Sequence, residues 1–357
     1  MIQAFGERAG VGAAALGAAS SVVDDHGRAV HGCYDGPVAL RAEAFRLRDL
    51  FGREVGAFRK RMALGGFTYL GLVTDDVLVG LAAVRLGYLA QVFGYLYDFR
   101  TGRLREFGRQ MRPGRLAFPL EPDAHLIRFE GRGDRLLIHK DHRTGMLRAE
   151  ARFGSLEVAA QVAFGFDQRP LRVVNPSCGD PYRFTFTEKC SPLGLEAVSA
   201  RLDGVERLPE ATRVHALYDW SAGYFARHTN WLWAAFAGRL ADGRPVGANL
   251  AALVNESFYP ENAVWVGGAR TRLSRVIFDW DPADPAGRPW RMFTEDGRLD
   301  LRFDPGGERA DQRRLPFVKV HFRQLFGTFS GILPDGDGPP MVLDPVHGLA
   351  ELHLSVW

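Results

Sequence analysis

The side chains that could do chemistry are concentrated between residues 215 and 233. This segment holds two histidines, two tyrosines, three tryptophans, an aspartate and an arginine. A core strand rarely carries so many polar groups, because each buried one needs a partner. The wall of a ligand pocket combines aromatic surface with a few polar groups. The segment therefore predicts a pocket whose ligand contacts Trp220, Tyr224, Arg227, Trp231 and Trp233. The alternative is a core segment in which Asp219 pairs with Arg227 as a buried support.

A second cluster of polar side chains follows between residues 249 and 265. Asn249 and Asn255 share one face of an otherwise apolar strand, which fits the mouth of a barrel. Glu256 and Glu261 could serve there as acid and base, with Asn255 as a further ligand contact. A well-capped turn over 255–262 explains the same residues without any ligand.

The C-terminal residues 321–331 and 348–353 also combine polar side chains with glycines. Their alternation favours two strands that close a barrel, with glycine allowing a sharp bend. We therefore expect these residues to be structural rather than functional.

Several familiar signatures are missing from the chain. It has no Walker A loop, no GxSxG elbow, no HExxH and no GxGxxG between a strand and a helix. The three cysteines have unrelated spacings, and no pair of the ten histidines has metal-ligand spacing. We therefore expect no metal and no cofactor. Neither the net charge of +3 nor the arrangement of basic and aromatic residues predicts a nucleic-acid partner.

The elements that must position these residues are predicted to be strands. Short apolar runs alternate with turn residues every 8–12 positions, which is typical of a meander of hairpins. In residues 148–153 charged and apolar side chains alternate, as in a strand with one wet face. The fold class is therefore all-β with few short helices, of which 42–51 is one candidate.

The length of 357 residues favours two domains. We expect an irregular N-terminal segment over 1–35, one β domain over 36–194 and a second, carrying the site, over 195–357. No apolar run reaches the roughly 18 residues that span a bilayer, so no integral membrane contact is expected. The N-terminus lacks a basic start, and Glu7 and Arg8 interrupt a signal-like apolar region. A cytoplasmic location is therefore expected.

These motifs resemble an uncharacterised bacterial and fungal family, domain of unknown function 2804. The resemblance covers the chain from about residue 36 and rests on five groups of residues, which lie in 59–69, 95–98, 215–233, 255–265 and 327–331. The family is similar in turn to the double-lipocalin group of carotenoid 1,2-hydratases and AttH-like proteins. That similarity implies two lipocalin-like antiparallel barrels in tandem, with a ligand in a barrel mouth or between them.

The same similarity implies that an acidic residue protonates an isolated double bond. Asp219 matches that role, with His215, Tyr218 and Trp220 around it. Burial among aromatic rings would raise the pKa of Asp219, whereas a cation such as Arg227 against it would keep the carboxylate ionised. In that case His215 or Glu256 becomes the better acid.

Three functions remain open at this point. The first is a cofactor-independent acid–base enzyme, a hydratase, lyase or isomerase, acting on a small to medium hydrophobic, unsaturated substrate. The second is a lipocalin-like carrier that binds the same apolar molecule without converting it. The third is a carbohydrate-active enzyme, since aromatic platforms beside carboxylates also suit glycosidic cleavage.

Overall fold

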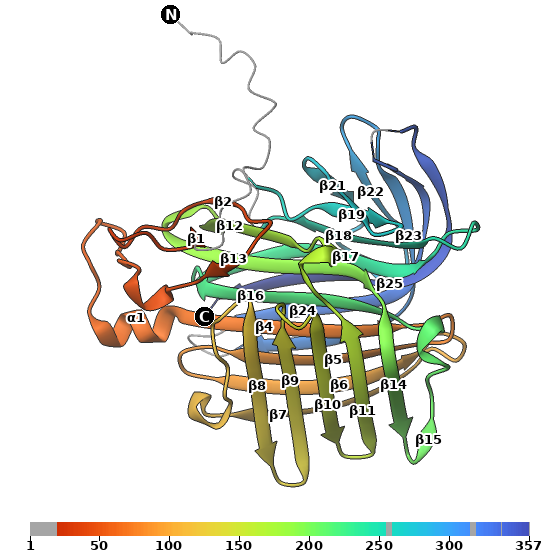
Figure 1. Ribbon diagram of the computed structural model, residues 1–357, viewed down its shortest axis with the longest axis horizontal. Coiled ribbons are helices and arrows are strands. Elements are labelled where there is room, and N and C mark those ends of the chain that lie inside the picture. Colours follow the sequence, from red (N-terminus) through yellow and green to blue (C-terminus); the bar gives the residue numbers. More distant parts are fainter. Residues whose placement is uncertain (1–19, 255–258, 315–318, 337, 357) are drawn as a thin grey trace, which may run out of the picture.

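The computed structural model describes residues 20–254, 259–314, 319–336 and 338–356. Its centre is an eight-stranded antiparallel sheet (Figure 1). In spatial order this sheet contains β2 (Gly32–Cys33), β12 (Leu171–Ser177), β13 (Asp180–Leu193), β16 (His215–Tyr224), β4 (Leu64–Val73), β5 (Val77–Arg85), β6 (Ala90–Asp98) and β7 (Arg103–Met111).

A six-stranded antiparallel sheet covers one face of the central sheet. Its order is β15 (Val205–Glu206), β14 (Leu195–Leu202), β11 (Leu156–Ala163), β10 (Met146–Phe153), β9 (Asp134–Asp141) and β8 (Ala124–Gly131). The strict alternation of buried and exposed residues in β8 to β11 shows that this sheet has one wet face. The largest apolar core lies between the two sheets and includes Leu70, Leu72, Phe153 and Trp220.

The C-terminal residues form a nine-stranded antiparallel sheet with its own core. Its order is β20 (Ala269–Arg272), β19 (Ala263–Val266), β18 (Pro245–Ala252), β17 (His228–Arg239), β25 (Met341–Val356), β24 (Lys319–Leu333), β23 (Asp300–Arg314), β22 (Trp290–Thr294) and β21 (Val276–Asp279). Contacts between β18 and β21 show that the sheet curls back on itself. Trp290, Phe303 and Phe329 fill the inside of the curl.

Helices are few in the described part of the chain, as expected for an all-β fold. The one α-helix there is α1 (Ala57–Ala63), and the 3-10 turns are η1 (Ala42–Ala44), η2 (Pro113–Arg115), η3 (Phe166–Gln168) and η4 (Ala211–Arg213). The helix expected over 42–51 is therefore wrong apart from the single turn η1. The short strands β1 (Ser20–Ser21) and β3 (Val38–Ala39) pair in parallel beside the central sheet.

The chain leaves the first two sheets after Tyr224, and the strands that follow belong to the third sheet. Strands β14 and β16 follow residue 194, yet they pair with β11, β13 and β4 of the first two sheets. The division of the sheets therefore falls about thirty residues beyond the domain boundary that we predicted from the sequence.

The middle strands of the central sheet are buried on both faces because the third sheet packs against the other side, whereas the edge strand β7 is mostly exposed. Tyr69, Val73 and Leu217 point away from the first core and meet Trp233 and Phe326 of the third sheet. Successive side chains of a strand point to opposite faces. Strands β4, β5, β6 and β16 therefore each contribute one set of residues to the first core and the other set to the interface between sheets.

Candidate functional site

A cavity of about 250 Å³ lies at the interface between the central and third sheets. Strands β4, β5, β6, β13 and β16 form one wall, and β17, β18, β23, β24 and β25 form the other. Aromatic and apolar side chains dominate the lining, with a small group of charged residues among them. The aromatic part of the lining includes Phe67, Tyr69, Phe93, Trp231, Trp233 and Phe322.

The charged group is organised around Lys189. Its Nζ lies 2.6 Å from Oδ2 of Asp219 and 3.5 Å from Oε2 of Glu261. Strand register brings the first two together, because Lys189 of β13 lies directly opposite Asp219 of β16. The ammonium also lies 5.4 Å from the centre of the Trp233 ring. All three charged side chains are buried, so the lysine shares its charge between two carboxylates.

Burial and pairing act in opposite directions on this group. Burial raises the pKa of Asp219, and the neighbouring ammonium of Lys189 limits that rise. Burial alone would lower the pKa of Lys189, but the attraction of Asp219 and Glu261 raises it above its ordinary value. Lys189 is therefore charged at neutral pH, and its contact at 2.6 Å favours the ionised form of Asp219.

Glu351 is a carboxyl group of the same cavity that is held by hydrogen bonds rather than by an ion pair. Trp231 Nε1 donates to its Oε2 at 2.9 Å, and Gln324 Nε2 donates to its Oε1 at 2.6 Å. Among the described residues no lysine or arginine lies within ion-pair distance of Glu351. Burial raises the pKa of Glu351 to about 7, although both hydrogen bonds oppose the rise. Glu351 is therefore partly protonated at neutral pH.

One ring stack and one pair of hydroxyl groups lie among the aromatic residues of the two walls. The rings of Trp231 and His353 stack with centres 3.7 Å apart and planes 3° from parallel. Burial lowers the pKa of His353 to about 3, so this imidazole is neutral. On the facing wall, Tyr69 and Tyr95 share a hydrogen bond of 2.8 Å between their hydroxyl groups.

The structure brings four of the predicted site residues to this cavity. Asp219, Trp231, Trp233 and Glu261 all line it. Asn255 and Glu256 lie outside the described residues. The C-terminal strands, which we expected to be only structural, supply Gln324, Glu351 and His353 to the cavity lining.

Three predicted site residues of β16 face the first core and point away from the cavity. Tyr218, Trp220 and Tyr224 belong to the core between the first two sheets. Placing Tyr218 and Trp220 beside Asp219 was therefore wrong, because neighbours on a strand point to opposite faces. Tyr218 instead lies 3.3 Å from Nε2 of His125, and Tyr224 donates to the carbonyl of Ala42.

His215 and Arg227 do not line the cavity either. His215 stands at the start of β16, at the opposite end of the strand from Tyr224. Burial lowers the pKa of its imidazole to about 4. Arg227 is exposed after the end of β16. The cation against Asp219 is Lys189 rather than Arg227, which corrects the alternative pairing drawn from the sequence.

Sequence reasoning missed Lys189 and Glu351 as site residues. Lys189 is one of only four lysines in the chain and stands in a run of strand-forming residues, which was a usable signal. Glu351 and His353 alternate with Leu352, and that period of two places both on one face. Their place opposite β17 depends on long-range pairing, which the sequence pattern does not contain.

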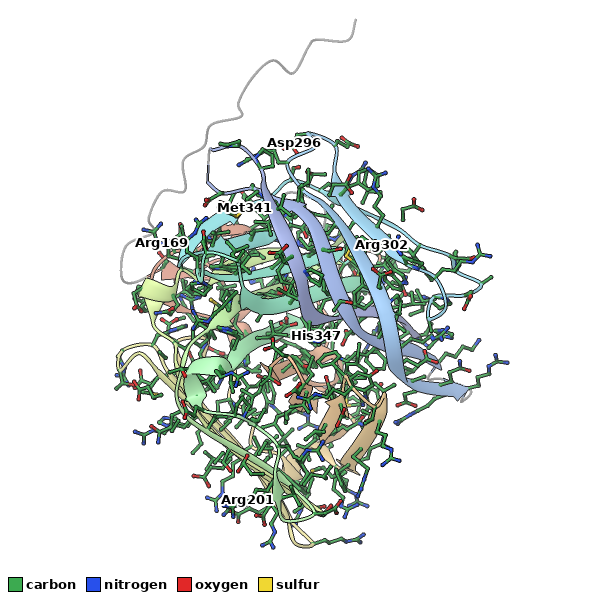
Figure 2. The ribbon with its side chains drawn as sticks, turned by 90° about the vertical axis from the view of Figure 1, so that its right-hand side faces the viewer. Arg169, Arg201, Asp296, Arg302, Met341 and His347 are labelled. Carbon is green, nitrogen blue, oxygen red and sulfur yellow. The ribbon has the colours of Figure 1, made fainter. Side chains whose placement is uncertain are left out.

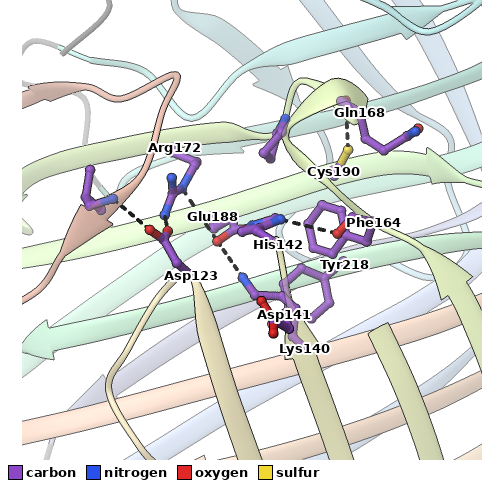
Figure 3. A network of polar contacts seen from close by, with 12 residues as sticks. Asp123, Lys140, Asp141, His142, Phe164, Gln168, Arg172, Glu188, Cys190 and Tyr218 are labelled. Atoms are coloured by element: carbon purple, nitrogen blue, oxygen red, sulfur yellow. Dashed lines mark hydrogen bonds and ion pairs between the residues drawn. The ribbon is translucent and has the colours of Figure 1, made fainter. Parts of the chain in front are cut away.

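A second buried charge network lies on the opposite face of the central sheet (Figure 3). Glu188 Oε2 lies 2.7 Å from Nζ of Lys140, and Oε1 lies 2.6 Å from Nε2 of His142. Arg172 lies 3.6 Å from Glu188 and also pairs with Asp123. Burial lowers the pKa of Lys140 to about 8. These groups satisfy one another inside the first core, so we regard the network as structural.

Neither a metal-binding cluster nor a long apolar helix occurs in the described ranges. No group of three or more His, Cys, Asp or Glu side chains there has an arrangement that could hold a metal ion. No helix among those residues is long and apolar enough to cross a membrane.

Comparison with solved structures places the fold among known proteins. The crystal structure of kievitone hydratase from Nectria haematococca is similar, with a TM-score of 0.52 and 11% identity over 82% of this chain and 89% of that chain. A structure of CghA with Sch210972 has a TM-score of 0.45 and 10% identity, over 94% of this chain and 97% of that one. The likeness to the hydratase confirms the predicted fold of two tandem lipocalin-like barrels.

Comparison of the sequence itself gives the family. No curated protein matches the chain. The family model described as "Domain of unknown function (DUF2804)" matches residues 16–357, which is nearly the whole sequence. This match confirms the resemblance drawn from the motifs, and the protein is a member of the DUF2804 family.

Proposed function

We propose that this protein is a cofactor-independent acid–base enzyme that converts a small to medium hydrophobic, unsaturated molecule. The reaction would be a hydration, its reverse elimination, or an isomerisation. The observation that carries the proposal is the pair of unlike carboxyl groups in one aromatic cavity. Glu351 has no ion-pair partner among the described residues and a pKa of about 7, whereas Asp219 is paired with Lys189. Two carboxyl groups whose environments differ in this way suit one acid and one base.

The two carboxyl groups reach the same cavity from different walls. Glu351 of β25 lies opposite Trp233 of β17, and Trp233 also lies beside Lys189, the partner of Asp219. The charge of Asp219 contributes to the raised pKa of Glu351, so the two groups are near enough to act on one substrate.

The steps of the reaction follow from the two protonation states. Protonated Glu351 would give its proton to one alkene carbon, and the other carbon would become cationic. The faces of Trp231 and Trp233 would stabilise that charge by roughly 0.5–2 kcal/mol each. In a hydration, water would bond to the cationic carbon while the carboxylate of Asp219 takes its extra proton. In an isomerisation, Asp219 would instead remove a proton from a neighbouring carbon. In both reactions Asp219 would then release its proton to solvent, and solvent would return a proton to Glu351.

This assignment changes the acid that we inferred from the sequence. With a cation beside it, Asp219 is the better base, and the sequence reasoning named His215 or Glu256 as the acid in that case. His215 does not line the cavity. Glu351 lines it and is buried in apolar surroundings, so we assign the acid to Glu351.

The test uses the apolar molecules that co-purify with the full chain, identified by mass spectrometry. The protein is incubated with each of them in water labelled with heavy oxygen. Hydration adds the mass of one labelled water, and isomerisation in heavy water exchanges hydrogen for deuterium. Glu351→Gln and Asp219→Asn are expected to bind the same molecule but to lower turnover by at least about a hundredfold, the usual contribution of an acid or base. Glu308→Gln, an exposed carboxyl bound to Arg323, is the matched control and should keep full activity.

A carrier is the second candidate, and the mostly apolar lining of the cavity favours it. A carrier would return every ligand unchanged in both labelled solvents, which would refute the proposed reaction. The same apolar lining counts against a carbohydrate substrate, because each buried sugar hydroxyl would need a polar partner.

A further inference from the structure

Three of the four most exposed large apolar side chains in the described ranges lie in α1 or in the loop before it. Leu50 is 87% exposed, Phe51 81% and Phe58 67%; the fourth is Val342 at 71%, and Val205 follows at 60%. Helix α1 buries none of its residues and lies at one end of the molecule (Figure 1). A cluster of protruding apolar side chains of this kind marks an interaction surface rather than ordinary soluble surface.

This cluster borders the opening of the cavity. The loop between β5 and β6 packs on α1, because a Cβ on Gly87 would lie 2.3 Å from the backbone of Met62. Tyr88 in the same loop lines the cavity and is 40% exposed, so the cavity reaches the surface there. The ring of Phe225, another lining residue, packs against Gly65 just after the helix.

Basic side chains without ion-pair partners surround the opening. Arg59 and Arg61 of α1 are exposed, and neither has such a partner among the described residues. The same holds in the described chain for Arg227, Arg314 and Lys319, at strand ends that register brings to this end of the molecule.

Most acidic side chains near α1 are already bound to neighbouring basic side chains or backbone amides. Asp49 accepts backbone hydrogen bonds from Phe51 and Arg53. Glu54 lies 3.8 Å from both Arg46 and Arg48, and Asp311 is bound to Arg313. Glu43 and the neighbouring Glu121 are exposed, and neither has an ion-pair partner among the described residues. They are outnumbered by the five basic side chains just named. The end as a whole is therefore cationic.

We propose that the α1 face, defined by Leu50, Phe51, Phe58, Arg59, Arg61 and Tyr88, docks on an anionic lipid bilayer. Protruding apolar side chains would enter the headgroup region while the arginines meet anionic lipid. An apolar molecule could then pass between the bilayer and the cavity without crossing water. The proposal concerns where the ligand comes from, and it holds for an enzyme and for a carrier alike.

The test measures co-flotation of the full chain with two kinds of vesicle. One contains phosphatidylcholine alone, and the other also contains phosphatidylglycerol. Binding is expected only to the anionic vesicles and should weaken as salt is added. The variant R59Q/R61Q should bind about twenty-fivefold more weakly, at about fivefold for each basic side chain. Phe58→Asp should lower binding by at least about tenfold, because it removes an inserted ring and adds a negative charge.

Matched controls come from the side of the molecule away from α1. Val342 is the comparable exposed apolar residue, and Figure 2 views the protein from that side and shows its neighbour Met341. Arg103 is an exposed arginine at the far end of β7. Val342→Asp and Arg103→Gln should leave vesicle binding unchanged.

Three results would overturn the proposal. They are failure to bind anionic vesicles, equal loss of binding in the α1 variants and the controls, and a dimer that Phe58→Asp dissociates without any vesicle binding by the wild type. All the substituted side chains are exposed, so each variant is expected to keep the fold, and its circular dichroism spectrum should match that of the wild type.

Discussion

Replacing Lys189 by methionine removes the cation from the centre of the cavity group. Coulomb's law at an effective dielectric constant of about 20 gives roughly 6 kcal/mol for a contact at the 2.6 Å between Lys189 and Asp219. The cost of burying the charges offsets much of that attraction. In the variant, Asp219 can avoid a buried charge by binding a proton. The free energy of protonating Asp219 therefore sets an upper limit on the loss of stability that this residue can cause.

This upper limit on the loss of stability increases as the pH rises. Keeping Asp219 protonated costs about 1.4 kcal/mol for each pH unit above its ordinary value of 3.8. The cost is therefore about 4 kcal/mol at pH 7 and under 2 kcal/mol at pH 5. A carboxyl whose pKa is raised in the folded state stabilises below its unfolded value, and that contribution is lost as pH rises through the folded value. Lys189→Met should therefore be markedly less stable at pH 7 than at pH 5, relative to the wild type.

Urea unfolding of the variants at both pH values measures the effect. The double variant K189M/D219N should recover most of the loss, because no buried charge is then left without a partner. Lys140→Met is the matched control, since Glu188 keeps Arg172 and His142 beside it. That control should show no comparable difference between pH 5 and pH 7. Equal loss at both pH values in Lys189→Met, or additive losses in the double variant, would refute the reasoning.

Three further predictions follow from the same contacts. Trp231→Phe removes a hydrogen bond to Glu351 that favours the ionised form, so the carboxyl band of Glu351 in infrared titration should disappear at higher pH than in the wild type. Between pH 8 and 10.5 the wild type should gain up to about 3 kcal/mol relative to Lys140→Met, because burial lowers the pKa of Lys140 from 10.5 to about 8; chemical unfolding across that range measures this. Gly80→Ala places a Cβ 2.3 Å from the ring of Tyr95 and should lower thermal stability, at a cost of about 1–3 kcal/mol.

The sequence was sufficient for the fold class because its signals are local. Alternation in residues 148–153 predicts a strand with one wet face, and β10 has that pattern over Met146–Phe153. Turn residues between apolar runs likewise predict the hairpins of the six-stranded sheet. The order of strands in the central sheet was less accessible, because β16 pairs with β4, about 150 residues earlier in the chain. Nothing in the residues around 195 reveals that pairing.

The candidate site was only partly predictable for a related reason. Composition identified the segment 215–233 correctly as the densest in chemistry, and Asp219, Trp231 and Trp233 do share the cavity. Composition does not say which face each residue occupies, and Tyr218 and Trp220 occupy the other one. Applying the period of two to Asp219 would have excluded both neighbours. The partners Lys189 and Glu351 come from other strands, so only three-dimensional register could identify them.

The alternation along β13 and β16 also ties the two buried charge networks to one register. Glu188 lies opposite Trp220, and Lys189 lies opposite Asp219 on the other face. A slip of one residue would turn every side chain of one strand to the wrong face. Lys189 would then enter the first core, where Lys140 already lies, and Glu188 would lose its cations. Each network therefore penalises the slip that would disrupt the other, and the structural network around Glu188 holds Lys189 and Asp219 in the arrangement that the proposed chemistry requires.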